Sequence, residues 1–306
     1  MYSRCLLCRA PFPELGILRH LPRGDLVAYD MDRGRLWVVC RQCRRWSLVP
    51  LESRWETLEE LERIVAGVSG AGLEARLLAK TDHVALFREG SMEIVRVGSA
   101  GLTEEASWRY GNLPGLPRRR RGLRRRRRAT VVWKGARSCS ACGYVFQELP
   151  YTDRKILIVR PEEEEEQPPS LIRRCPWCRD ADEGGLHLRG LEADLTLARV
   201  MAFEQDAPAS LRKVDAAVRV VEREGPAALV RLLTRHGRPI GDLPPVGLLA
   251  LEIYATEARE KALLSMEVAA LEARWRREEE LASLIDGNLT PVPLLEELVR
   301  RFRREG

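Results

Sequence analysis

All eight cysteines of the chain stand in Cys-x-x-Cys pairs, and none is left over. The pairs are Cys5/Cys8, Cys40/Cys43, Cys139/Cys142 and Cys175/Cys178. Each pair offers two thiolates from one tight turn, and two such turns complete a tetrahedral shell of four sulfurs, the usual structural site for Zn²⁺. The sequence therefore predicts two metal ions per chain, in the form of structural Zn²⁺.

The spacing also indicates how the pairs combine. The second set of two pairs repeats the first at offsets of 134 or 135 residues. Joining the first pair to the second, and the third to the fourth, closes the shorter loops, although exchange between the two sets stays open. A disulfide framework suits a short secreted chain, and redox Cys-x-x-Cys motifs need a strand-to-helix setting, so neither explains this pattern as well.

The second set resembles the knuckles of rubredoxin-like and zinc-ribbon proteins over residues 139–178. The resemblance is carried by Cys139-Ser-Ala-Cys142-Gly143 and by Cys175-Pro-Trp-Cys178. It departs at Arg179, which replaces the usual second glycine, and Arg9 and Arg44 replace both glycines in the first set. Rubredoxin binds iron for electron transfer, so the resemblance implies an iron electron carrier as a minor alternative. The departures favour structural zinc at both sites.

Basic charge is concentrated in one short segment. Residues 109–137 hold twelve cationic and no acidic side chains, although the whole chain carries only +6. The core of this segment is a run of nine arginines: Arg118, Arg119, Arg120, Arg121, Arg124, Arg125, Arg126, Arg127 and Arg128. The planar guanidinium makes bidentate phosphate contacts and stacks on bases, so the run predicts binding of nucleic acid, RNA or DNA. A solvated linker is the alternative.

We find no pattern that indicates an enzyme. The sequence contains no phosphate-binding loop, no Gly-x-Gly-x-x-Gly, no Gly-x-Ser-x-Gly and no His-Glu-x-x-His, and its four histidines are scattered. A complete shell of four cysteines leaves no open position at the metal for water. We therefore expect no catalytic residue and a non-catalytic binding function.

The expected fold class is α+β. We predict a first zinc ribbon over 1–50, a small α+β extension over 51–113, an Arg-rich linker over 114–130, a second zinc ribbon over 131–190 and a helical domain over 191–306. Turn residues Met31–Gly34 separate strands at 26–30 and 35–39, and further strands are expected at 73–79, 83–88, 93–97, 130–134, 155–160 and 170–174. A capping box at Ser53–Glu56 predicts a helix to about Ala66, and another is expected at 104–110.

Five helices are expected in the C-terminal region, at 191–204, 208–223, 226–235, 245–286 and 291–304. Along the fourth, residues at alternating spacings of three and four form a seam of small side chains: Leu248, Leu251, Ala255, Ala258, Ala262, Ser265 and Ala269. The seam predicts close packing against another helix, in a hairpin within the chain or in a homodimer. A protein–protein scaffold that uses these helices is the alternative function.

No uncharged apolar run approaches the ~20 residues that a membrane-spanning helix needs. The N-terminus carries Arg4 and Cys5 in place of an apolar signal segment. We therefore expect no membrane partner and a cytoplasmic location.

Overall fold

The computed structural model describes residues 3–8, 10–68, 75–112, 130–150, 157–160, 170–178, 185–189, 192–193, 196–197, 200–201, 208–234 and 243–285. The arginine run 118–128 and the expected helix 291–304 lie outside the described residues. The chain divides into two compact units, Met1–Arg259 and Glu260–Gly306. The expected α+β class is confirmed. Within the described residues, no helix carries an apolar stretch that could cross a bilayer.

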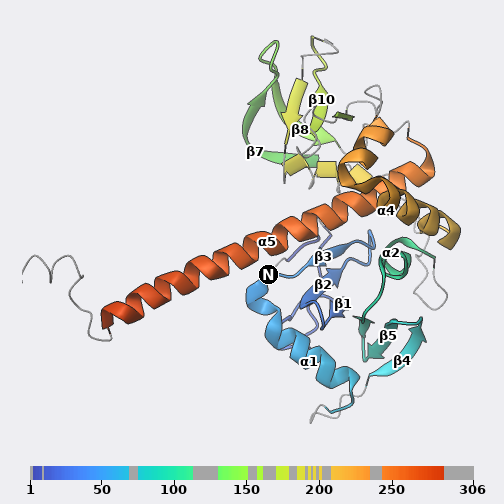
Figure 1. The fold of residues 1–306 in the computed structure, drawn as a ribbon, viewed down its shortest axis with the longest axis vertical. Coiled ribbons are helices and arrows are strands. Elements are labelled where there is room, and N and C mark those ends of the chain that lie inside the picture. Colours follow the sequence, from blue (N-terminus) through green and yellow to red (C-terminus); the bar gives the residue numbers. More distant parts are fainter. Residues whose placement is uncertain are drawn as a thin grey trace, which may run out of the picture. The chain divides into compact units, whose positions relative to one another are not determined.

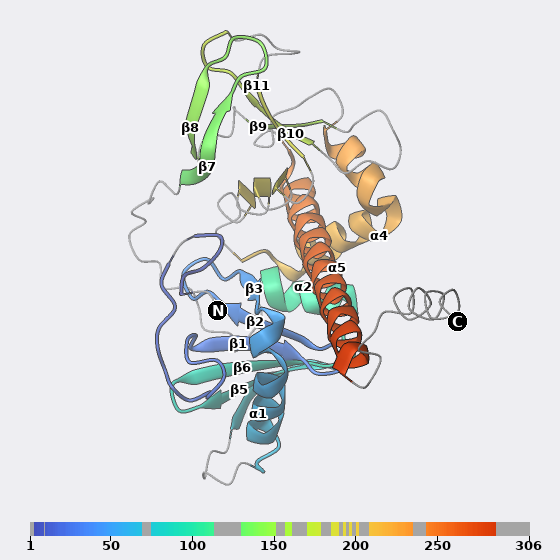
Figure 2. The ribbon, with the colours of Figure 1, turned by 90° about the vertical axis from the view of Figure 1, so that its left-hand side faces the viewer.

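One six-stranded sheet organises the N-terminal part of the first unit (Figures 1 and 2). Its strands are β1 (Leu26–Asp30), β2 (Arg35–Val39), β3 (Trp46–Leu48), β4 (Arg76–Lys80), β5 (Val84–Glu89) and β6 (Met92–Val97), in the order β3-β2-β1-β6-β5-β4. Strands β1 and β6 pair in parallel, and the other neighbours are antiparallel. The parallel pair joins the segment expected as a ribbon to the segment expected as its extension, so one sheet runs through both.

Helix α1 (Trp55–Val65) covers part of this sheet. Its buried residues Leu58, Leu61 and Ile64 recur at helical spacing and belong to the same apolar cluster as Val27 and Ile94 of the sheet. The predicted capping box is wrong, because Ser53 lies in a 3-10 turn, η1 (Leu51–Ser53), and the N-cap is Arg54 with no side-chain cap. The buried guanidinium of Arg54 donates instead to the carbonyl of Val49, at 2.6 Å from Nη2, and this bond fixes the entry to the helix.

The second cysteine-bearing segment consists of two small sheets. Strands β7 (Thr130–Ser138) and β8 (Val145–Pro150) form an antiparallel pair. Strands β9 (Leu157–Arg160), β10 (Ser170–Arg174) and β11 (Gly185–Leu188) form an antiparallel sheet in the order β11-β10-β9. The sequence did not reveal β8 or β11, which are short strands next to the cysteines. Phe146, Leu171 and Leu188 are buried in the core of this module.

Three further helices are described: α2 (Leu102–Tyr110), α4 (Leu211–Thr234) and α5 (Pro245–Ile285). The predicted break at Gly225-Pro226 is wrong, since α4 continues through it. An internal proline costs a helix about 3 kcal/mol, but packing can offset this, and Val214, Ala217 and Val218 of α4 are buried against α2 and α5.

The small-residue seam of α5 is buried in its first part and exposed further along the helix. Leu251 and Ala255 are fully buried within the first unit. Ser265 and Ala269, which continue the seam in the second unit, are exposed. The predicted helix 245–286 therefore matches the observed helix, whereas the described residues show close packing only for the first part of the seam.

Candidate metal centres

The first centre brings together the sulfurs of Cys5, Cys8, Cys40 and Cys43, all within 4.8 Å of one another. Two of the Sγ–Sγ distances, Cys5–Cys43 and Cys8–Cys40, are 3.6 Å. A Zn–S bond of about 2.3 Å places the corners of a tetrahedron about 3.8 Å apart, whereas a disulfide would require about 2.05 Å. The four sulfurs are thus spaced as ligands of one metal ion.

The second centre repeats this arrangement with Cys139, Cys142, Cys175 and Cys178, again within 4.8 Å of one another. The Sγ–Sγ distance is 3.8 Å for Cys139–Cys178 and 3.5 Å for Cys142–Cys175. The cysteine pairs therefore combine within each set, which answers the question that their spacing left open. The structure brings all eight predicted ligands into two clusters that fit zinc-ribbon-like knuckles.

Backbone hydrogen bonds shape the turns that carry these sulfurs. In the second centre, Cys139 N–H donates to the carbonyl of Tyr144 and Gly143 N–H donates to that of Cys139. In the first centre, Cys40 N–H donates to Arg45 and Arg44 N–H to Cys40. Gly143 has φ of 71° and Arg44 has φ of 62°, in the left-handed region that favours glycine. Arg44 thus adopts the glycine conformation at a cost of about 1–2 kcal/mol, which explains how the knuckle forms without the glycine.

Four thiols this close cannot all ionise unless a cation balances their charge. In the first centre, hydrogen bonds with Cys40 and then with Cys5 and Cys8 raise the pKa of Cys43 well above its ordinary value. The hydrogen bond with Cys40 lowers the pKa of Cys5. Ionisation of one thiol thus disfavours ionisation of the adjacent ones. Four adjacent thiolates need a divalent ion to balance them, and metal binding therefore releases protons. A shell of four sulfurs is closed and leaves no position at the metal for water.

The two centres differ in exposure. At the first centre Cys5, Cys40 and Cys43 are buried. At the second centre Cys142 is exposed and Cys178 is half-buried. Each centre has one half-buried cysteine, Cys8 in the first and Cys178 in the second, so the difference lies in the exposed Cys142 of the second centre.

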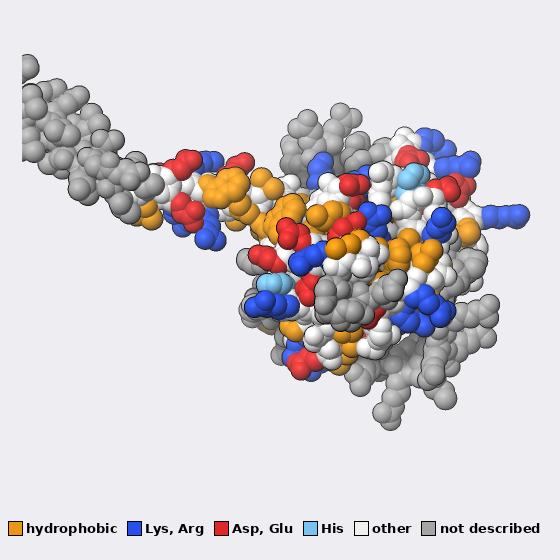
Figure 3. All heavy atoms as spheres, turned by 90° about the horizontal axis from the view of Figure 1, so that it is seen from below, with side chains coloured by type: hydrophobic (Ala, Val, Ile, Leu, Met, Phe, Trp, Pro, Cys, Tyr) orange, Lys and Arg blue, Asp and Glu red, His pale blue; other side chains and the backbone are white. Residues whose placement is uncertain are grey.

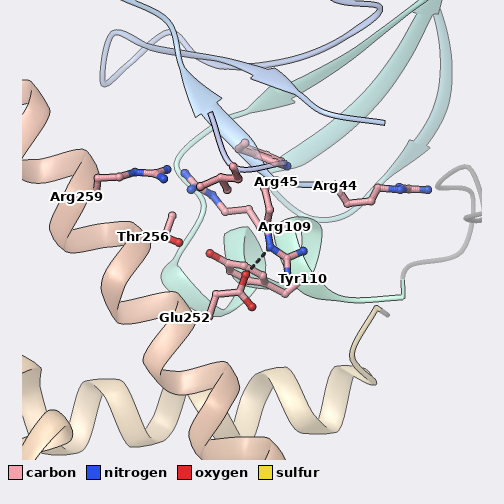
Figure 4. Close-up of a pocket in the computed structure, with 9 residues that line it drawn as sticks. Arg44, Arg45, Arg109, Tyr110, Glu252, Thr256 and Arg259 are labelled. Atoms are coloured by element: carbon pink, nitrogen blue, oxygen red, sulfur yellow. Dashed lines mark hydrogen bonds and ion pairs between the residues drawn. The ribbon is translucent and has the colours of Figure 1, made fainter. Parts of the chain in front are cut away.

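The first centre is linked to α2 and α5 through Arg45, two residues after Cys43 (Figure 4). Arg45 donates from Nη1 to the carbonyl of Cys43 at 3.2 Å and forms an ion pair with Glu252 of α5. Its guanidinium carbon lies 5.5 Å from the centre of the Tyr110 ring. Thr256 and Arg259 of α5 line the same small cleft. Arg45 therefore connects the first metal centre both to α2 and to α5.

A second group of buried charges holds α2 to the sheet. Glu105 of α2 accepts from Arg109 at 2.6 Å and from Arg35 of β2 at 3.1 Å, and Arg35 also pairs with Asp30 at 3.0 Å. The guanidinium carbon of Arg109 lies 4.8 Å from the ring centres of both Trp37 and Trp46. Sequence reasoning missed these residues and Arg45–Glu252, because pairs up to 207 positions apart leave no local pattern.

No family model, curated protein or solved structure matches this chain.

Proposed function

We propose that the protein is a non-catalytic zinc-binding protein that binds nucleic acid through the arginine run 118–128. The observation that carries its metal-binding part is the pair of tetra-cysteine clusters, each with all sulfurs within 4.8 Å. Zinc is favoured over iron because the knuckles depart from the rubredoxin pattern, with Arg9, Arg44 and Arg179 in place of glycine. Iron at the second centre is the minor alternative.

The nucleic-acid part rests on charge and on position along the chain. The nine arginines lie between Asn112, at the end of the described N-terminal segment, and Thr130, which begins β7. The run thus connects two metal-bearing modules whose folds are held by thiolate ligands. Arginine forks suit bidentate phosphate contacts, and a dense run of them raises the local concentration of polyanions.

The test is the salt dependence of binding to a single-stranded oligonucleotide. If about five arginines contact phosphates, log affinity should fall against log salt with a slope near −3.5, from about −0.7 per phosphate. Replacing Arg124–Arg128 with alanine should weaken binding and flatten this slope. The matched control replaces exposed arginines of two helices, Arg219, Arg274, Arg276 and Arg277, and should leave the slope unchanged. Wild-type binding by the Arg124–Arg128 variant would refute the nucleic-acid function.

A protein scaffold is the second candidate, favoured by one feature of α5. Met266, Val268, Trp275 and Leu281 each expose more than half of their surface, at 57% or 58%. Figure 3 shows hydrophobic side chains lying among charged ones along this helix. Exposed apolar side chains that gather into a contiguous patch are typical of surfaces that bind another protein. Wild-type nucleic-acid binding by the Arg124–Arg128 variant would favour the scaffold function.

A further inference from the structure

Trp177 is the most exposed of the large hydrophobic side chains in the described residues, with 79% of its surface accessible. It stands between Cys175 and Cys178 in the second metal centre, and its backbone N–H donates to Cys175 Sγ at 3.4 Å. Pro176 before it restricts the backbone further. The indole is therefore presented to solvent by a turn that the metal centre holds in place.

A second aromatic ring belongs to the same centre. Tyr144 and Val145 follow the Cys139–Cys142 turn and are exposed at 40% and 46%. The Tyr144 ring packs edge-on against buried Phe146, with ring centres 5.4 Å apart and planes at 87°. This contact fixes one side of the tyrosine and leaves the remainder of the ring to solvent. We call Tyr144, Val145 and Trp177 the aromatic knuckle face.

The first centre has no such face. The position equivalent to Trp177 in the Cys-x-x-Cys turn is Gln42, and the position equivalent to Tyr144 is the buried Ala10. Holding four sulfurs around a metal therefore does not require exposed aromatic side chains. The aromatic knuckle face is therefore a separate property of the second centre.

One exposed cation next to this face favours an anionic ligand. Of the three arginines in the described segments 137–146 and 171–178, Arg173 is buried over the Phe146 ring and Arg137 pairs with Glu192 at 2.8 Å, so the exposed cation is Arg174. Arg174 is exposed and directly precedes Cys175. An exposed aromatic ring beside a cationic group suits single-stranded nucleic acid. The faces of unpaired bases stack on aromatic side chains, and arginine binds the phosphates.

We propose that the aromatic knuckle face stacks unpaired bases of single-stranded nucleic acid, with Trp177 as its main contact. This inference rests on the proposed function and assigns to the second metal centre a part of the same binding surface. Base stacking tolerates any sequence because every base has a π-face. The face should therefore distinguish single strands from polyanions that lack bases, and should show little sequence preference.

The experiment compares Trp177→Ala, Trp177→Phe and Trp275→Ala in the full chain. Trp275 is a matched control, because it is 58% exposed but lies on α5. The ligands are a single-stranded oligonucleotide and heparin, a polyanion without bases, at one salt concentration. Metal content measured for each variant confirms that the second centre is intact.

We expect Trp177→Ala to weaken oligonucleotide binding about tenfold, in line with the loss of one stacked base. Trp177→Phe should retain most of the affinity, and heparin binding should not change in any variant. Equal oligonucleotide binding by wild type and Trp177→Ala would overturn the stacking role while the arginine-based function stands. An equal loss for oligonucleotide and heparin would also overturn it. A wild-type chain that binds no nucleic acid would overturn both proposals.

Discussion

Single residues determine how the first knuckle and the sheet are held. The cysteines could be assigned to metal from the sequence because ligand spacing within a turn is local. The substitution of Arg44 for glycine was visible too, but only the structure shows that the arginine adopts a φ of 62° and keeps the turn. The buried ion pairs of Arg35, Glu105 and Arg109 could not be predicted. Charged residues usually lie on the surface, and the sequence does not indicate which of them the fold buries.

Replacing Glu105 with glutamine should destabilise the protein by about 3–5 kcal/mol, since it leaves Arg35 and Arg109 buried with less compensating charge. Burial raises the pKa of Glu105, but Arg109 and then Arg35 outweigh this and hold the pKa below its ordinary value. The carboxylate therefore contributes stability that is present above the unfolded pKa of about 4.3 and is lost as pH falls through the folded value.

Urea unfolding at several pH values measures both effects. The Glu105→Gln variant should lose stability at neutral pH and show a weaker decline on acidification than wild type. The exposed Glu278→Gln on α5 serves as control and should change stability by less than about 0.5 kcal/mol. A neutral-pH stability equal to wild type for Glu105→Gln would contradict the structural role of this cluster.

Elements were predicted well where their pattern is local. Strands β1, β2 and β10 begin and end at the predicted residues, because short runs with apolar residues stand beside turn residues or prolines. The parallel pairing of β1 with β6 was not predictable, because it joins segments more than sixty residues apart. The break expected at Gly225-Pro226 is wrong, because α4 runs through both residues, and the buried Val214, Ala217 and Val218 belong to an earlier part of the same helix.

The seam of α5 allows a test at the level of one helix. Ala255 is fully buried, so Ala255→Leu should overpack the first unit and cost about 1–3 kcal/mol. Ala269 lies on the same seam but is exposed, so Ala269→Leu should cost less than about 0.5 kcal/mol. Thermal unfolding measures the stability of both variants, and sedimentation measures their molecular mass. A change of molecular mass caused by Ala269→Leu would instead place the seam in a homodimer.

At the scale of the whole molecule, the chain carries two metal centres with duplicated cysteine spacing and a connection rich in arginine. The duplication was evident from sequence because every cysteine takes part in it. The burial of each centre was not evident from the sequence, since it depends on the rest of the fold. The first centre has three buried cysteines and is connected to α5 through Arg45, while the second exposes Cys142, Trp177 and Tyr144. The stacking role that we propose therefore belongs to the second centre alone.

The central claim is that each cluster holds one metal ion, and metal content per chain tests it most directly. The full chain, purified without chelators, should contain about two Zn²⁺ by elemental analysis, and its eight cysteines should resist a thiol reagent until a chelator removes the metal. A metal content near zero, with eight thiols reacting freely in the folded protein, would contradict the account.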